Sequence, residues 1–130
     1  MANNQINVFV LEDVPIFQKE IKRVLAEIVF TNQNLEVKQF FTLKDAEKQL
    51  QELTNSFDLF ILDGSLEPGF GYELIPTIKR TNPKAKIVMC SISLKHNDTG
   101  LKNGADMAIN KIDFSSKNQE IRTKLIELLN

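Results

Sequence analysis

The chain has 130 residues, 42% of them hydrophobic, which is enough for one domain with a continuous core. Its 16 basic and 17 acidic residues nearly cancel and neither sign forms a long block, so charge gives no reason to expect binding to nucleic acid or to an acidic membrane. The apolar run at residues 8–11 is too short for a signal peptide or a membrane span, and the single cysteine, Cys90, excludes an intrachain disulfide and fits a reducing compartment. We therefore expect one cytoplasmic domain over residues 1–130, without an output domain.

Short apolar runs alternate along the chain with segments of helical period, which is typical of βαβ units that build a parallel sheet. Five strand-helix repeats are predicted. The strands cover residues 6–11, 35–40, 57–63, 86–90 and 107–110. The third helix is expected over 72–80, shortened or bent by Pro76, and a short fourth helix over 98–103.

Helix starts are predicted where a short polar side chain can accept a hydrogen bond from the first helical turn. Asp13 stands just before Pro15, a residue that suits the first turn of a helix. Thr42 and Ser116 each have a polar residue three positions later, the spacing of a capping box. These three side chains are the expected caps of the first, second and last helices.

Polar side chains follow four of the predicted strands: Glu12 and Asp13 the first, Asp63 the third, Ser91 the fourth and Lys111 the fifth. In an open parallel sheet, ligands bind outside the carboxyl ends of the strands. Three carboxylates placed together repel one another, and a hard divalent cation with oxygen ligands, most naturally Mg²⁺, relieves that repulsion. The lysine and the hydroxyl suit the oxygens of an incoming phosphoryl group, and a carboxylate such as Asp63 can be its nucleophile.

These residues, in this order and at these strand ends, resemble the receiver domains of bacterial two-component response regulators, including the stand-alone chemotaxis regulators. The resemblance spans essentially the whole chain. The loop 63–74 and the later Asn103-Gly104-Ala105-Asp106 also look like signatures of the family. The resemblance implies a doubly wound (βα)₅ flavodoxin-like α/β fold, a three-layer sandwich whose five-stranded parallel sheet has the order 2-1-3-4-5.

The resemblance also implies a set of roles. Asp63 would accept a phosphoryl group from a histidine kinase or a phosphotransfer protein, with Ser91 and Lys111 assisting. Mg²⁺ would be held by Glu12, Asp13, Asp63 and the backbone carbonyl of Ser65. The protein would signal to a downstream target protein by direct contact, without nucleic acid or membrane, and would catalyse only its own phosphorylation and dephosphorylation.

Several positions depart from the family pattern. Ala108 stands where an aromatic switch residue is usual, and Ile92 where a small residue is usual. Ile112 replaces a proline that is commonly cis, and since a cis bond there would cost about 3 kcal/mol, we expect a trans bond and a shifted loop. Neither Ser65 nor Ser93, at the two positions that tune dephosphorylation, carries an acid or amide to orient water, so a long-lived phosphoryl group is expected.

Two other classes of function remain open. One is a degenerate receiver-like module that binds a partner protein without phosphorylation. The other is a small enzyme on the same fold, either a flavin carrier or an aspartate-nucleophile phosphatase. The acidic loop after the first strand disfavours flavin, and Ser65 occupies the place of the second aspartate that a phosphatase needs. His96, the only histidine, is expected in a polar surface loop, and Phe70 and Tyr72 are candidate partner contacts near the site.

Overall fold

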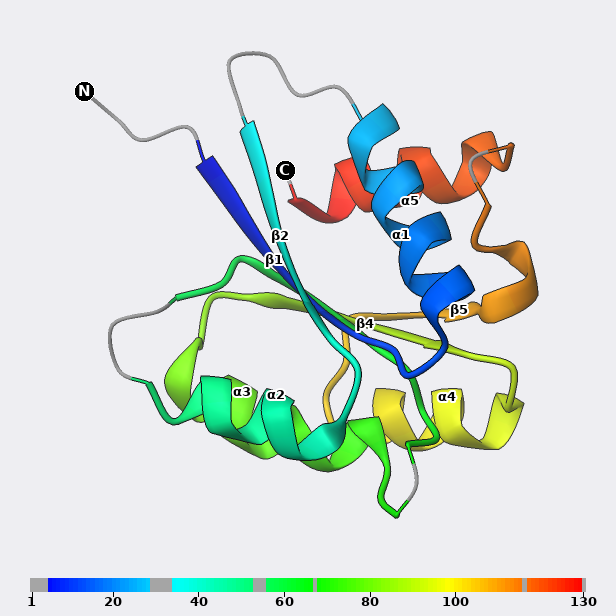
Figure 1. Ribbon diagram of the computed structural model, residues 1–130. Coiled ribbons are helices and arrows are strands. Elements are labelled where there is room, and N and C mark those ends of the chain that lie inside the picture. The colour runs from blue at the N-terminus through cyan, green and yellow to red at the C-terminus, as the bar shows by residue number, and fades with distance from the viewer. Residues whose placement is uncertain (1–4, 29–33, 53–55, 67, 116, 130) are drawn as a thin grey trace.

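The structure is a computed structural model that describes residues 5–28, 34–52, 56–66, 68–115 and 117–129. Five parallel strands form one sheet in the order β2-β1-β3-β4-β5, which confirms the predicted fold. The strands are β1 (Gln5–Leu11), β2 (Asn34–Phe40), β3 (Leu59–Leu62), β4 (Lys86–Ser91) and β5 (Met107–Asn110). The α-helices are α1 (Pro15–Glu27), α2 (Leu43–Leu50), α3 (Ile75–Thr81), α4 (Leu94–Lys102) and α5 (Gln119–Leu129). Helices α1 and α5 cover one face of the sheet and α2, α3 and α4 the other (Figure 1).

The core has two halves because successive strand residues point to opposite faces of the sheet. Val8 and Val10 pack in the half under α1 and α5, whereas Phe9 and Leu11 pack in the half under α2 and α3. All four residues of the central strand β3 are buried, as a strand covered on both faces requires. Cys90 is a core residue, and burial raises the pKa of its thiol to about 12, so the thiol stays protonated.

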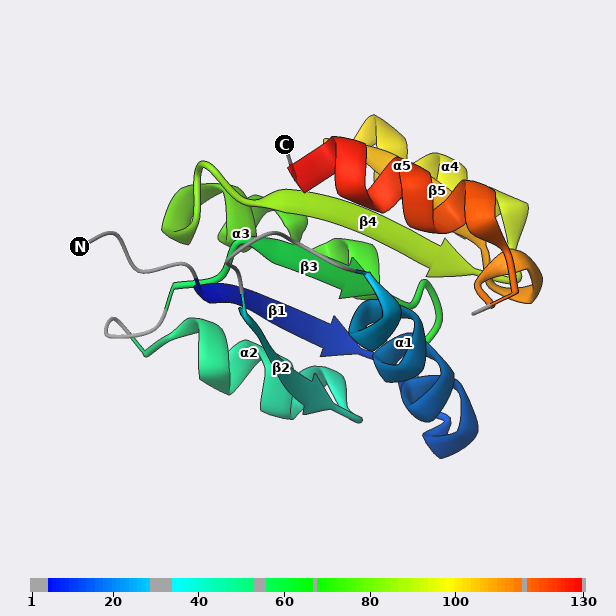
Figure 2. The same ribbon diagram turned by 90° about the horizontal axis from the view of Figure 1, so that it is seen from above.

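All five strands run in the same direction, so their carboxyl ends meet at one edge of the sheet (Figure 2). The turn Lys111–Asp113, a 3₁₀ helix, follows β5 at that edge. None of the helices in the described ranges is both long and apolar enough to cross a membrane. The edge formed by the carboxyl ends is where the predicted site residues lie.

The predicted helix caps have different outcomes. Thr42 caps α2 by accepting a hydrogen bond from the amide three residues later at 3.1 Å, which confirms that prediction. The prediction for Asp13 is wrong, because Val14 is the N-cap residue of α1 and no side chain caps that position. Instead, Glu12 Oε2 accepts a hydrogen bond from the Val14 amide at 3.0 Å. Ser116 lies outside the described residues.

The bounds of two central elements also differ from the prediction. The strand expected over 57–63 is shorter at both ends, because β3 is paired as a strand only over Leu59–Leu62. The helix expected over 72–80 is divided into a 3₁₀ turn, Gly71–Leu74, and the helix α3. Pro76 lies in the first turn of α3, where its missing N–H costs no helical hydrogen bond, so the proline marks a start rather than a bend.

The fourth helix is longer than predicted. It begins at Leu94 and not at 98, and Ser93 caps it by accepting a hydrogen bond from the His96 amide at 3.1 Å. The placement of His96 in a loop is therefore wrong. The periodicity of apolar residues did not predict the first turn of α4, because this helix buries the polar Asn97 and leaves the apolar Leu94 exposed.

Candidate functional site

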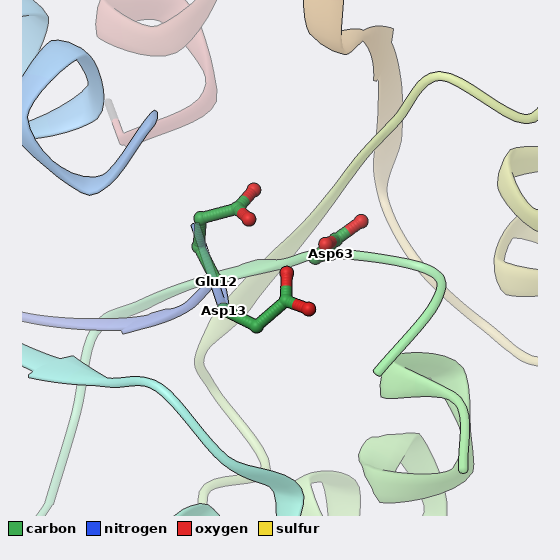
Figure 3. A group of neighbouring side chains, drawn as sticks. All are labelled: Glu12, Asp13 and Asp63. Atoms are coloured by element: carbon green, nitrogen blue, oxygen red, sulfur yellow. The ribbon is translucent and has the colours of Figure 1, made fainter. Parts of the chain in front are cut away.

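Three carboxylates gather at the carboxyl ends of β1 and β3 (Figure 3). Glu12 and Asp13 follow β1 directly, and Asp63 follows β3. The Glu12 amide donates to Phe40 O at 3.0 Å and the Asp63 amide donates to Leu11 O at 2.9 Å, so the sheet ladder fixes both backbones. One oxygen of each carboxylate lies within 4.8 Å of one oxygen of each of the others. Glu12 and Asp63 are 1% and 5% exposed, whereas Asp13 faces solvent.

Lys111, just after β5, places its ammonium group inside this cluster. Its Nζ lies 2.7 Å from Glu12 Oε1 and 3.1 Å from Asp63 Oδ2. The ammonium also stands 4.7 Å from the centre of the Phe17 ring, a cation-π distance. The Lys111 side chain is only 7% exposed, so one buried positive charge is shared between two buried carboxyl groups.

Burial sets the protonation of the cluster. Burial raises the pKa of Glu12 to about 7, against the hydrogen bonds from Lys111 and the Val14 amide that lower it. Burial likewise raises the pKa of Asp63, and attraction to Lys111 opposes that rise. Burial would lower the pKa of Lys111, but its ion pairs with Glu12 and Asp63 outweigh the burial and raise its pKa. The cluster therefore holds more negative charge than one lysine fully compensates, and a further cation would favour the ionised carboxylates.

Ser91 closes the site from the β4 side. It is the last residue of β4, is 2% exposed, and accepts a hydrogen bond from the Ser93 amide through Oγ at 3.1 Å. A β-carbon on Gly64, the residue after Asp63, would lie only 2.9 Å from Ser91 Oγ. The hydroxyl therefore packs directly against the backbone that follows Asp63.

The loop after Asp63 folds back onto that residue. The Gly71 amide donates to Gly64 O at 3.2 Å, and a β-carbon on Gly71 would collide with the Asp63 carbonyl oxygen. The Ser65 amide lies 3.5 Å from Asp63 Oδ1, at the limit of a hydrogen bond. The use of the Ser65 carbonyl as a metal ligand stays a prediction.

Two residues that matter for the site escaped the sequence reasoning. The ring of Phe17, in the first turn of α1, covers the Lys111 ammonium. Gln18 is buried, and its Nε2 donates to Phe40 O at 2.9 Å and to Glu12 O at 3.1 Å, which holds the backbone of the acidic pair. The signal that was available is spacing, since Gln18 lies three residues before Ile21 on the inner face of α1.

The departures from the family pattern lie around the rim of the site. Ile92 and Ile112 are 57% and 74% exposed, on the segments that follow β4 and β5. Ala108 is partly buried and borders a groove of about 530 Å³ between α4 and β5. Leu94 and Leu101, both exposed, also border this groove. The rim is therefore more apolar than the buried centre.

The donor set fits a small divalent cation. Carboxylate oxygens are the ligands that Mg²⁺ prefers, and Glu12, Asp13 and Asp63 offer one each within a single 4.8 Å cluster. In the parts of the chain that the structure describes, this is the one group of three or more histidine, cysteine or acidic side chains placed to hold a metal ion. The Lys111 ammonium already neutralises part of the same charge.

A doubly wound parallel sheet with a carboxylate cluster and a buried lysine at its carboxyl edge defines a class of α/β proteins with one polar site at the strand ends. Comparison with family sequences makes this specific: the response regulator receiver domain matches residues 8–125, and the chain belongs to this family. None of the curated proteins is similar enough in sequence to be matched.

Solved structures of receiver domains share the fold. The BeF3-activated DrrB receiver domain has 21% sequence identity and a TM-score of 0.76, with 96% of this chain and 97% of that chain covered. A CheY-like receiver domain protein from Methanospirillum hungatei JF-1 has 21% identity and a TM-score of 0.74, covering 96% and 94%. TrrA from Thermotoga maritima, solved in complex with Mg(2+)-BeF, has 22% identity and a TM-score of 0.74, covering 95% and 98%.

Proposed function

We propose that this protein is a phosphorylated receiver that takes a phosphoryl group onto Asp63 from the phosphohistidine of a histidine kinase or a phosphotransfer protein. The observation that carries the proposal is the burial of Asp63 at the carboxyl edge of the sheet, in one cluster with the acidic pair and with the Lys111 ammonium 3.1 Å from its Oδ2. In the reaction, an Asp63 oxygen forms a bond to phosphorus as the bond from phosphorus to the donor imidazole nitrogen breaks. The electron pair of the broken bond returns to the imidazole.

Each of the other polar side chains of the site has a role in this phosphoryl transfer. Lys111 balances negative charge that the phosphoryl oxygens bring, because its ammonium already lies 3.1 Å from Asp63 Oδ2. Ser91 donates its hydroxyl to one of those oxygens. Glu12, Asp13 and Asp63, with the Ser65 carbonyl, would hold Mg²⁺, which when bound neutralises the phosphoryl oxygens. The crystal structure of TrrA in complex with Mg(2+)-BeF supports the assignment of Mg²⁺, since the two chains share the receiver fold.

The phosphorylated protein signals by a change in its affinity for a downstream target protein. Phosphorylation replaces the single negative charge of the Asp63 carboxylate with a group that carries about two negative charges, beside Lys111 and Ser91. The protein works in the cytoplasm, where it meets its phosphohistidine donor, and it catalyses no reaction except its own phosphorylation and dephosphorylation. The apolar rim of Ile92 and Ile112 is the surface that the donor protein must approach.

A second candidate function is constitutive partner binding without phosphorylation. The observation in its favour is the combination of Ala108 with the exposed Ile92 at the site entrance. Retention of the complete carboxylate cluster and the paired Lys111 favours the phosphorylated receiver over this alternative.

The test is the intact mass of the protein after incubation with a small-molecule phosphodonor and Mg²⁺, and then with a phosphorylated histidine protein. We expect a single phosphate adduct that disappears with chelator and in Asp63→Asn. Asp58→Asn is the matched control, because Asp58 precedes the same strand at the opposite edge of the sheet and accepts a hydrogen bond from the Asn7 amide at 2.8 Å. An adduct that persists in Asp63→Asn, or none with any donor, would contradict the proposal and favour constitutive binding.

A further inference from the structure

We propose that His96 and Ser93 are positioning residues for phosphoryl transfer, and that they act by holding the Ser91 hydroxyl against the residue that follows Asp63. This inference rests on the proposed function, since it assigns the groups that prepare one of its residues. Neither Ser93 nor His96 reaches the carboxylate cluster, so both would act only through Ser91.

A chain of two hydrogen bonds links these residues. The Ser93 amide donates to Ser91 Oγ at 3.1 Å, and the His96 amide donates to Ser93 Oγ at 3.1 Å as the cap of α4. A hydroxyl has one donor and two acceptor sites. Because the Ser93 amide occupies an acceptor site of Ser91, the hydroxyl proton of Ser91 is left to be donated to a phosphoryl oxygen. The α4 cap in turn fixes the Ser93 amide.

The His96 ring fastens this first turn of α4 to the chain beyond Asp63. Its centroid lies 5.1 Å from that of Phe70, in an edge-to-face arrangement, and 6.0 Å from that of Tyr72. Phe70 and Tyr72 stack on each other at 5.2 Å with an interplanar angle of 6°. His96 Nδ1 is buried without a hydrogen-bond partner, and the His96 ring contacts those of Phe70 and Tyr72.

There is no free space between the two segments. A β-carbon on Gly64 would lie 2.6 Å from His96 Cβ and 2.9 Å from Ser91 Oγ, closer than side-chain atoms approach. Gly64 therefore packs directly against both His96 and Ser91. A displacement of the first turn of α4 must change the position of the Ser91 hydroxyl relative to Asp63.

This arrangement offers a physical reason for two positions that depart from the family pattern, Ala108 and Ser93. Ala108 has no ring to reorient at the α4 and β5 surface. The ring cluster of Phe70, Tyr72 and His96 instead joins α4 to the loop that carries the phosphoacceptor. Ser93 is used as a helix cap and as the donor to Ser91, which explains why it need not carry an acid or an amide.

The test is a double-mutant cycle on the rate of Asp63 phosphorylation by a small-molecule phosphodonor in Mg²⁺. We expect His96→Ala to slow the reaction by about 2- to 10-fold, the range that aromatic contacts of this kind contribute. His96→Phe keeps a ring and should restore most of the rate, and Lys95→Ala, an exposed neighbour on α4, should leave it unchanged. In a Ser91→Ala background His96→Ala should cause no further loss. An equal loss in both backgrounds would overturn the positioning role, since it would show a general structural effect.

A second measurement does not depend on phosphorylation. Amide hydrogen exchange of the unmodified protein should speed up selectively at Ser93 and His96 in His96→Ala, with the amides of α5 unchanged. Unchanged exchange at Ser93 would overturn the inference. If the wild type forms no adduct at all, the proposed function fails, and exchange alone then decides whether His96 holds Ser93 and Ser91 in place.

Discussion

Replacing Lys111 with methionine removes one buried positive charge and keeps the length of the side chain. The lost ammonium lies 2.7 Å from Glu12 Oε1 and 3.1 Å from Asp63 Oδ2 in a side chain that is 7% exposed. Removing one partner of a buried ion pair costs about 3 to 5 kcal/mol when the other stays charged. Both carboxyl groups can take up a proton instead, because burial raises both their pKa values, that of Glu12 to about 7. We therefore expect a loss of about 3 kcal/mol at about pH 8 and a smaller loss at about pH 5.

Urea unfolding in the presence of EDTA measures this loss, and Lys19→Met is the control, since Lys19 is exposed in the middle of α1. Mg²⁺ should stabilise Lys111→Met, by about 1.4 kcal/mol at ten times the dissociation constant, because it neutralises the unpaired carboxylates. A cost below about 0.5 kcal/mol at pH 8, the level of an exposed pair, would refute the reasoning. So would a cost that is the same at both pH values.

Three other perturbations follow from the same contacts. The pKa of Glu12 is about 7 in the folded protein, against an ordinary 4.5, so the folded state binds this proton more tightly than the unfolded chain does. The contribution of Glu12 to the free energy of unfolding is therefore greatest at low pH and falls as the pH rises toward 7. In EDTA, the stability of the wild type relative to Glu12→Gln should therefore fall over this range, and a flat difference in urea midpoints would show that Glu12 titrates normally. Gly71→Ala should lose about 1 to 3 kcal/mol and also the adduct, because its β-carbon meets the Asp63 carbonyl; full adduct formation would show that the loop adjusts. Asn97→Leu should lose about 2 kcal/mol in urea unfolding, because the buried Asn97 amide donates to carbonyls of both β4 and β5 at 3.1 and 3.2 Å, and a neutral result would mean that water replaces it.

The parts of the fold that were predictable are those where apolar residues recur with a fixed period. The strand at 107–110 has the predicted bounds. The order of the five strands was not predictable from this period and is the one that the resemblance to receiver domains implied. The fourth helix was misjudged because its burial is opposite to its hydropathy. Asn97 and Gly100 are buried, Gly100 because a β-carbon there would meet the Met89 side chain, whereas Leu94 and Leu101 are exposed.

The candidate site was predictable as a set of strand-end residues but not in its electrostatics. Parallel strands bring Glu12, Asp63 and Lys111 to one edge wherever their side chains point. Sequence could not show that Glu12 is almost fully buried, that Lys111 bridges it to Asp63, or that Phe17 covers the ammonium. These features depend on χ angles and on packing between α1 and the segment after β5, which spacing along the chain does not encode.

The measurement that most directly tests phosphoryl transfer to Asp63 is chemical trapping of the modified residue. Borohydride reduces an aspartyl phosphate to homoserine, which tandem mass spectrometry locates after proteolysis. We expect homoserine at position 63 after exposure to a phosphodonor and Mg²⁺, and none when Mg²⁺ is chelated. Homoserine at another acidic residue, or intact aspartate at 63 in protein that carries the phosphate mass, would contradict the assignment.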